Sequence, residues 1–363
     1  MKWFETYTSN TIAGSGNQHY FLTGDQEIHR GRVYYKIFAG GTYNYSLLFS
    51  NIIDSTFSDG SVSHSNLICD EWEILEVSLG ICKTSSLTAA EEPEKTVTMT
   101  FNGSAGKTVM PGEFFTSDAV EISAEKGDFL CMDISFRGTM IPYHEETMLP
   151  TFELQNGEWI PCKHVPFAGM IGCDRKVEKR VGFFGDSITQ GLGTPYNKYT
   201  HWNALAADAI GEKYSYWNLG LGYGRAQDAA SDGAWMFKAK QLDAAVVCFG
   251  TNDIGHDREL EQIKKDLLEI VLKLKAAGVK VLLQTLPPFD RKEGKQEKWL
   301  KVNEYVRKEL APQADAFFDV VPLLLDGPES EGKSKFNGHP NEMGSAIWAE
   351  KLIPVLKEFL ESV

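Results

Sequence analysis

Several features that would place the chain in other classes of protein are missing from the sequence. No run of about 18 consecutive apolar residues occurs. The start, MKWFETYTSNTIAG, lacks the apolar stretch of about 7 to 15 residues that a signal peptide needs. Positive charge is scarce, with 36 Lys and Arg against 50 Asp and Glu and a net charge of -14. We therefore expect a chain that is neither exported nor membrane-spanning, with no nucleic acid and no membrane as partner.

Metal-binding patterns are also missing. The six cysteines contain no C-x-x-C pair, and no histidine cluster has metal-ligand spacing. We expect no metal and no other cofactor. The cysteines are interpreted as reduced, mostly buried thiols of a cytoplasmic protein.

The length of 363 residues favours two domains, and the first half of the chain has the pattern of β-structure. Short strand-like runs lie at residues 32–38, 72–79, 96–101 and 129–136. Turn dipeptides such as Asn102-Gly103 and Asn156-Gly157 separate them, and no long helical period interrupts the region. We predict a jelly-roll-like β-sandwich domain over residues 1–175.

After residue 180 the pattern changes to strands that alternate with helices. Short apolar runs, expected to be buried parallel strands, lie at residues 181–184, 244–249, 279–283 and 316–318. Amphipathic stretches, expected to be helices, lie at residues 200–210, 258–277, 295–310 and 341–360. We predict a doubly wound α/β domain with a parallel sheet over residues 180–363, with its site beyond the carboxyl ends of the strands.

Three familiar motifs are incomplete in this chain. The segment FNGSAGKT has Phe101 where a phosphate-binding loop needs its first glycine, and we expect a hairpin turn there. The segment LGLGYG would need a further glycine at Arg225 to match a dinucleotide-binding loop. Thr189 stands where the nucleophile elbow of an ordinary α/β-hydrolase has glycine. The sequence therefore favours neither a phosphate site nor that hydrolase class.

Four blocks of the C-terminal half remain, and each lies near a predicted strand end or helix start. In chain order they read FFGDSITQG, WNLGLGYG, VVCFGTND and NGHPNEMG. The first places Ser187 at the end of a strand, where it can react, although a helix N-cap beside a turn residue Asp186 is the alternative. The third supplies the side-chain amide of Asn252, and the last supplies the imidazole of His339 before a helix.

Together these blocks resemble those of the GDSL or SGNH hydrolase superfamily, which carry Ser, Gly, Asn and His in this order. The resemblance implies that Ser187 is the nucleophile and His339 the general base. It also implies an oxyanion hole formed by the N–H of Ser187, the amide of Asn252 and the backbone of Gly222. The family's glycine falls at Tyr223 here, and Gly222 directly precedes it.

The last block departs from the family pattern D-x-x-H-P, because Phe336 stands where an aspartate would orient the histidine. Some carbohydrate-deacetylating relatives resemble this arrangement and orient the histidine with a backbone carbonyl. We expect the carbonyl of Asn337 to support His339 in this way. Asp186 is expected to support the turn of the nucleophile by accepting N–H bonds. A β-sandwich followed by an SGNH domain also resembles one family of carbohydrate esterases.

Three functions are compatible with these residues. We expect a serine esterase that removes short acyl groups, acetyl above all, from a small-molecule or oligosaccharide ester through an acyl-enzyme. A lipolytic esterase or thioesterase of the same superfamily is the alternative, and an inactive carbohydrate-binding relative is the second. A sugar-stacking platform among tyrosines of the β-rich half stays open, as does a homo-oligomer; the tyrosines are Tyr34, Tyr35, Tyr43 and Tyr45.

Overall fold

The computed structural model describes most of the chain. The described residues are 1–12, 18–21, 27–54, 66–84, 87–143, 148–162, 164–195, 197–291 and 294–362. They form two compact units, Met1–Glu178 with Ser215–Trp217 and Lys179–Tyr214 with Asn218–Val363. Within the described ranges no helix is long and apolar enough to cross a membrane.

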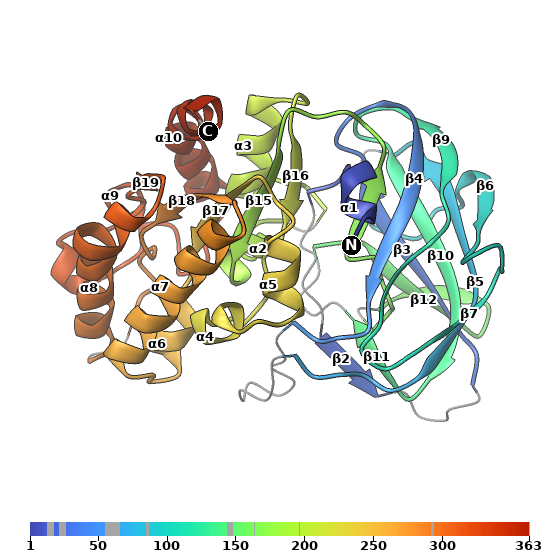
Figure 1. Cartoon of the computed structure of the whole chain (residues 1–363), viewed down its shortest axis with the longest axis horizontal. Helices are drawn as coiled ribbons and strands as arrows, with labels where there is room; N and C mark the ends of the chain where they lie inside the picture. Colours follow the sequence, from blue (N-terminus) through green and yellow to red (C-terminus); the bar gives the residue numbers. More distant parts are fainter. Residues whose placement is uncertain are drawn as a thin grey trace. The chain divides into compact units, whose positions relative to one another are not determined.

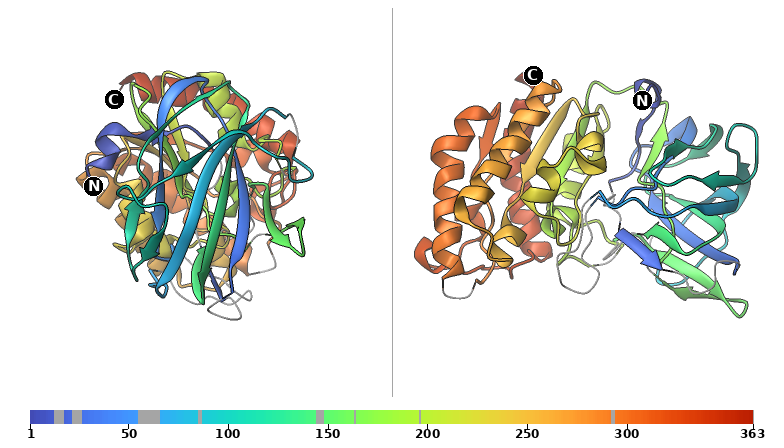
Figure 2. Two further views of the ribbon diagram at one scale, coloured as in Figure 1. Left: turned by 90° about the vertical axis from the view of Figure 1, so that its right-hand side faces the viewer. Right: turned by 60° about the horizontal axis from the view of Figure 1, so that its bottom comes forward.

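The first unit is a sandwich-like pair of antiparallel sheets, which confirms the predicted class of its fold (Figure 1; Figure 2, left). One sheet has the order β1 (Thr8–Ser9), β14 (Met170–Cys173), β4 (Gly41–Ser50) and β8 (Phe114–Thr116), with β9 (Val120–Ala124) also on β4. The other has the order β13 (Glu158–Pro161), β12 (Thr151–Gln155), β3 (His29–Lys36), β10 (Phe129–Gly138), β5 (Trp72–Cys82) and β6 (Glu94–Met99), with β7 (Lys107–Val109) also on β5. A further pair joins β2 (Gln18–Phe21) to β11 (Met140–Tyr143), and α1 (Trp3–Thr6) begins the chain.

The tyrosines considered as a sugar platform are mostly core residues. Tyr34 and Tyr45 are fully buried, and Tyr35 is 2% exposed. Only Tyr43 of the four is partly exposed, and its ring packs edge-on against Tyr45. These side chains stabilise the sandwich through apolar burial, and they do not form an exposed surface on which a sugar ring could stack.

The segment that resembles part of a phosphate loop is a hairpin turn, as expected. Phe101 and Ser104 pair across it, and Asn102 and Gly103 both have positive φ angles of 52° and 80°. The amides of Asn102 and Gly103 donate to the carboxylate of Asp118 at 3.2 and 2.7 Å. A carboxylate already accepts from this turn, so its N–H groups are not available to a phosphate.

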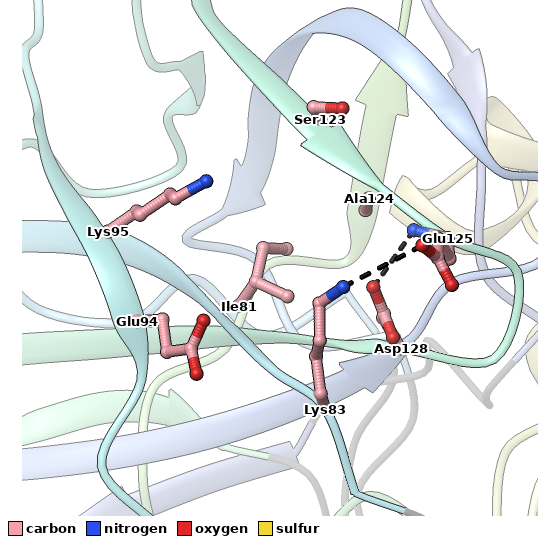
Figure 3. Close-up of a pocket in the computed structure, with 8 residues that line it drawn as sticks. All are labelled: Ile81, Lys83, Glu94, Lys95, Ser123, Ala124, Glu125 and Asp128. Atoms are coloured by element: carbon pink, nitrogen blue, oxygen red, sulfur yellow. Dashed lines mark hydrogen bonds and ion pairs between the residues drawn. The ribbon is translucent and has the colours of Figure 1, made fainter.

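The first unit also has a hollow of about 140 Å³ between three of its strands (Figure 3). Its lining consists of Ile81, Lys83, Glu94, Lys95, Ser123, Ala124, Glu125 and Asp128. Lys83 pairs with Glu125 at 3.7 Å, and the amide of Glu125 donates to Asp128 at 2.9 Å. No aromatic ring belongs to this lining, so the hollow lacks the stacking surface that sugar sites commonly use.

The remaining sheet is parallel, as predicted, and helices surround it; its strands belong to the second unit, apart from Ser215–Trp217 of β16 (Figure 1). The sheet has the order β16 (Ser215–Asn218), β15 (Arg180–Gly185), β17 (Ala244–Cys248), β18 (Lys280–Gln284) and β19 (Ala316–Phe318). The helices are α2 (Ser187–Gln190), α3 (Trp202–Ile210), α4 (Ala226–Ala230), α5 (Ala234–Ala239), α6 (Thr251–Gly255), α7 (Leu260–Ala276), α8 (Lys295–Tyr305), α9 (Val321–Leu324) and α10 (Glu342–Ser362). The strand order reverses on either side of β15, and ligands of such sheets bind where this reversal opens a crevice.

Two neighbouring phenylalanines of β15 show that helices cover both faces of this sheet. Successive side chains of a strand point to opposite faces. The ring of Phe183 packs on Trp202 of α3 at 5.4 Å, and Trp202 stacks on Trp348 of α10 at 4.6 Å. The ring of Phe184 packs instead on Trp235 of α5 at 5.2 Å. The sheet is therefore doubly wound, and its polar groups lie at the strand ends.

Candidate active site

Ser187 lies at the tight junction between β15 and α2. Asp186 caps the helix, because its side chain accepts from the amide of Ile188 at 3.0 Å. A Cβ at Gly185 would lie 2.1 Å from Thr189 Oγ1, and a Cβ at Gly220 would lie 2.2 Å from the amide nitrogen of Gln190. The two glycines therefore let the strand, the short helix and the next strand end approach one another closely. Ser187 itself is 5% exposed at the carboxyl end of its strand.

His339 reaches this serine from the other end of the unit's sequence. Its Nε2 lies 2.8 Å from Ser187 Oγ, so the hydroxyl can donate to the ring. The loop before α10 carries the histidine, and Asn341 caps that helix by accepting from the amide of Gly344 at 3.0 Å. A Cβ at Gly193 would lie 2.6 Å from the His339 carbonyl, which places the segment after α2 against the histidine. The structure thus brings together the predicted nucleophile and base.

The hydrogen bond expected from His339 Nδ1 to the Asn337 carbonyl is not formed. That carbonyl accepts the hydroxyl of Ser334 instead. Among the residues that the structure describes, none accepts a hydrogen bond from Nδ1. Asn337 lies in the left-handed region with a φ of 73°. The expectation was wrong because the sequence gives no sign of this conformation.

Among the residues with a described structure, no carboxylate takes the place of the missing aspartate. Phe336 is 8% exposed and packs against Gly344, where a Cβ would lie 2.7 Å from its own. The side chain therefore serves the packing of α10. Asp319, a candidate for a displaced acid, accepts instead from Thr285 at 2.8 Å and from Arg307 at 2.9 Å. Within the described part of the chain, the reactive pair is a serine and a histidine without an ionised partner on Nδ1.

The predicted oxyanion donors follow three adjacent strands: Ser187 comes after β15, Gly222 after β16 and Asn252 after β17. Asn252 follows β17, and its Nδ2 donates to the carbonyl of Gly224 at 3.0 Å, which leaves one amide hydrogen for a ligand. Gly224 closes a turn with Leu221, and this turn contains Gly222. The amide of Leu221 donates in turn to the Gly185 carbonyl, directly before the nucleophile junction. These bonds hold the asparagine side chain and the glycine turn at the end of β15.

Two backbone amides at this edge have no acceptor. In the portion of the chain that is described, the N–H groups of Ser187 and Gly222 donate to no protein atom. Buried amides are almost always paired, so donors left unpaired beside a nucleophile are well suited to a developing negative charge. The chain offers three donors here, two from the backbone and one from Asn252.

Burial sets the protonation of the groups around the nucleophile. Desolvation lowers the pKa of His339 below its ordinary value of 6.5, so the ring is neutral at pH 7 and can accept a proton. Burial raises the pKa of Asp186 to about 7, since this carboxyl is 2% exposed. Burial also raises the pKa of Asp253, which accepts from the Ala226 amide and from Arg258, both at 2.7 Å. The two aspartates hold loops and do not contact His339.

Two residues of the loop after β18 were missed by the sequence reasoning. The ring of Phe289 packs edge-on against His339 at 5.1 Å. Arg291 lies over Phe289 at 5.4 Å and donates from Nη2 to the carbonyl of Thr251 at 3.2 Å. Their position after a parallel strand was a usable signal, because loops at the carboxyl ends of such strands form the sites of these folds. Nothing in the described ranges groups three or more metal-ligating side chains.

Comparison with known proteins identifies the family of this segment. Residues 183–347 match the model of the GDSL-like Lipase/Acylhydrolase family. This segment, slightly less than half of the chain, is similar to that family. The GDSL-like match includes Ser187, Gly222, Asn252 and His339, and it leaves out the antiparallel unit. A search among curated proteins gives no match.

Solved structures resemble about half of this chain. A member of the lipolytic protein G-D-S-L family from Veillonella parvula DSM 2008 has 22% identity, a TM-score of 0.39 and coverage of 48% of this chain and 97% of its own. The acetyl xylan esterase AlAXEase has the same four values. An inhibitor-bound aryl esterase of M. smegmatis has 18% identity, a TM-score of 0.39 and coverage of 50% of this chain and 99% of its own.

Proposed function

We propose that the protein is a serine ester hydrolase that removes short acyl groups, acetyl above all, from carbohydrate esters through an acyl-enzyme. The observation that carries the proposal is the 2.8 Å approach of Ser187 Oγ to His339 Nε2 beside two unpaired backbone amides. A nucleophile, a neutral base and donors for an oxyanion are the groups that acyl transfer requires.

In the proposed reaction His339 takes the hydroxyl proton as Ser187 attacks the ester carbonyl. The carbonyl oxygen becomes an oxyanion and accepts from the amides of Ser187 and Gly222 and from the side chain of Asn252. The imidazolium then gives its proton to the departing alcohol, which leaves an ester on Ser187. Water, deprotonated by His339, attacks this ester in the second half and releases the acid.

The preference for a short acyl group is supported by the segment that lies against the histidine. Gly193 contacts the backbone of His339, and the described residues from Gly191 to His201 are mainly glycine, threonine, asparagine, lysine and other polar types. Such a segment offers little apolar surface to a long acyl chain. A cytoplasmic place of action is part of the proposal, because all six cysteines are free.

Hydrolysis of nitrophenyl esters with graded acyl chains tests the proposal. We expect kcat/KM for acetate to exceed that for octanoate, and acetylated xylo-oligosaccharides to release acetate. Equal or better turnover of octanoate would favour the lipolytic alternative. No turnover of any ester, together with binding of oligosaccharides, would favour the inactive relative. A fluorophosphonate adduct, located by peptide mass analysis, should lie on Ser187, and an adduct on another serine would contradict the assignment.

A further inference from the structure

Arg291 differs from the other ordered arginines of the second unit in what surrounds its charge. Arg258 donates to Asp253 and Asp266, and Arg307 pairs with Asp319 and Glu329. Arg291 makes no ion pair with any described residue, and its single hydrogen bond goes to a backbone carbonyl. Its Nε is buried and has no acceptor.

Burial of the guanidinium disfavours its charged form. Burial lowers the pKa of Arg291 to about 10, and the charge of Asp186 offsets only part of that effect. Asp186 is itself buried with a pKa raised to about 7, so it is only partly ionised near neutral pH. A guanidinium that is desolvated without a full counter-charge is a binding site for an anion, because an anion supplies both the charge and the missing acceptors.

The neighbours of the guanidinium place it beside the reacting groups. It lies over the ring of Phe289, which packs against His339. It also donates to the carbonyl of Thr251, directly before the oxyanion donor Asn252. In the proposed reaction His339 hands its proton to the departing alcohol, so the surface that continues from the imidazole contacts the alcohol part of the ester.

We propose that Arg291 binds an anionic group, a carboxylate or a phosphate, on the alcohol part of the ester substrate. The proposal rests on the proposed function, and it narrows the substrate to acylated sugar acids, sugar phosphates or similarly charged alcohols. Among the described residues the Nε and Nη1 of Arg291 meet no acceptor, and Nη2 uses one of its two hydrogens for Thr251. One edge of the planar guanidinium, either Nε with Nη2 or Nη1 with Nη2, therefore keeps two parallel N–H groups that match the two oxygens of a carboxylate or phosphate.

A matched pair of acetate esters tests the inference. 4-Acetoxybenzoate and its methyl ester carry the same acetyl group and the same ring, and they differ in the negative charge on the alcohol part. We expect Arg291→Gln to lower the ratio of kcat/KM for the charged ester to that for the neutral ester by about tenfold to a hundredfold. Arg291→Lys should retain part of the ratio. Comparing each variant with the wild type cancels the different reactivity of the two phenols.

Controls separate recognition from folding. Lys301→Gln removes the same charge from an exposed helix position that pairs with Glu297, and it should leave the ratio unchanged. Equal losses on both esters in Arg291→Gln would show that Arg291 only supports the fold, and would overturn the inference. Inhibition of the wild type by inorganic phosphate and by benzoate is measured separately, which distinguishes a phosphate site from a carboxylate site. If mono-4-nitrophenyl glutarate, which is charged on its acyl part, shows the selective loss instead, the assignment to the alcohol side is wrong.

A binding measurement separates failure of the inference from failure of the proposed function. Calorimetry with 4-hydroxybenzoate needs no turnover, and we expect Ser187→Ala to bind this product while Ser187→Ala combined with Arg291→Gln does not. If the wild type hydrolyses the neutral ester but 4-hydroxybenzoate does not bind, the function stands and the inference fails. If no ester is hydrolysed but Arg291 is needed for binding, the anion site stands and the proposed function fails.

Discussion

The two units contain buried guanidinium groups with opposite surroundings. In the first unit Arg32 is 2% exposed, and it donates to Asp133 at 2.6 and 2.7 Å and to Glu92 at 3.0 and 3.1 Å. In the second unit Arg291, whose Nε is buried, makes no ion pair with a carboxylate of any described residue. A guanidinium that is paired with carboxylates of its own chain serves the folded structure, whereas a guanidinium without such partners is available to an anionic ligand.

The same contrast extends to the backbone. The Asn102-Gly103 turn of the first unit donates both of its amides to Asp118, whereas the amides of Ser187 and Gly222 in the second donate to no described residue. Amides that are paired within a turn of one unit and amides left unpaired at one edge of the other indicate where a ligand can bind. The comparison predicts that substitutions at paired groups of the first unit lower stability, whereas substitutions at the unpaired edge of the second unit lower activity.

The largest expected effect is on the activity of Ser187→Ala. Removal of a serine nucleophile lowers kcat by about 10⁴-fold or more, and only the oxyanion donors and binding remain. Stability should change little, because the hydroxyl's one bond is to His339. Ester hydrolysis and thermal unfolding of the same preparation measure both. Activity within tenfold of wild type would place the nucleophile elsewhere.

The next effect is expected on stability alone, from Arg32→Met. Removing one partner of a buried ion pair leaves Asp133 uncompensated and costs about 3 to 5 kcal/mol in the free energy of unfolding. Arg180→Met is a matched control, because Arg180 pairs with Asp243 where both side chains are about a third exposed. That change should cost about 1 kcal/mol or less. Denaturant unfolding measures both, and an equal cost for the two variants would contradict the comparison.

Loss of the side-chain donor of Asn252 should lower activity without a comparable loss of stability. Removing one oxyanion donor costs about 10² to 10³ in kcat. Asn252→Ala also removes the bond to the Gly224 carbonyl, so its unfolding must be measured alongside. A loss that falls on KM, with kcat preserved, would assign the amide to substrate binding and not to the oxyanion.

The pH dependence of kcat/KM should have its acidic limb below pH 6.5. Burial disfavours the imidazolium of His339, which lowers its pKa from 6.5, and the reaction needs the neutral ring. The unfolded chain binds this proton more readily, so the stability that His339 contributes is present above about pH 6.5 and is lost as the pH falls. A limb centred above 6.5 that persists in Asp186→Asn would contradict the burial of His339.

The smallest effect is expected from Asn337, whose backbone lies in the left-handed region with a φ of 73°. Asn337→Ala should destabilise the loop by about 1 kcal/mol, whereas Asn337→Gly should be tolerated. Activity per folded molecule should stay close to wild type in both, since the carbonyl accepts from Ser334 and not from His339. A large loss of kcat in both variants would restore a role for the side chain in the reaction.

Sequence periodicity located the buried strands and the longer helices of the second unit, α3, α7, α8 and α10, because these have clear apolar patterns. It did not locate α4, α5, α6 and α9, which are too short to have one. The strand at Ala316–Phe318 has the predicted bounds, and the last helix begins within one residue of the expected start. The helix expected over residues 295–310 continues past Tyr305 as a π-helical turn over Val306–Leu310. A change in hydrogen-bond register of this kind leaves no trace in apolar spacing.

The parts of the site that escaped prediction depend on distant contacts. Arg291 is an ordinary loop residue in the sequence. The structure shows that it lies over Phe289, donates to the Thr251 carbonyl and makes no ion pair with a described carboxylate, and these contacts make it a candidate anion site. In the first unit, three of the proposed platform tyrosines are core residues, because alternation alone does not show which face of a strand is covered. The partners of a loop residue and the buried face of a strand are both set by tertiary packing.

Gly185 and Gly220 lie so close to the short helix α2 that substitutions at these two positions should be rejected when variants of the protein are selected for activity. One added methyl group at either glycine would meet atoms at 2.1 or 2.2 Å, so mutational libraries should find both positions intolerant even to alanine. Gly191 and Gly193, in the segment after that helix, are constrained as well, because both have a positive φ and an added Cβ would meet His201 at 2.8 Å or the His339 carbonyl at 2.6 Å. Directed evolution toward new acyl groups should therefore conserve all four glycines and accumulate its changes at other positions.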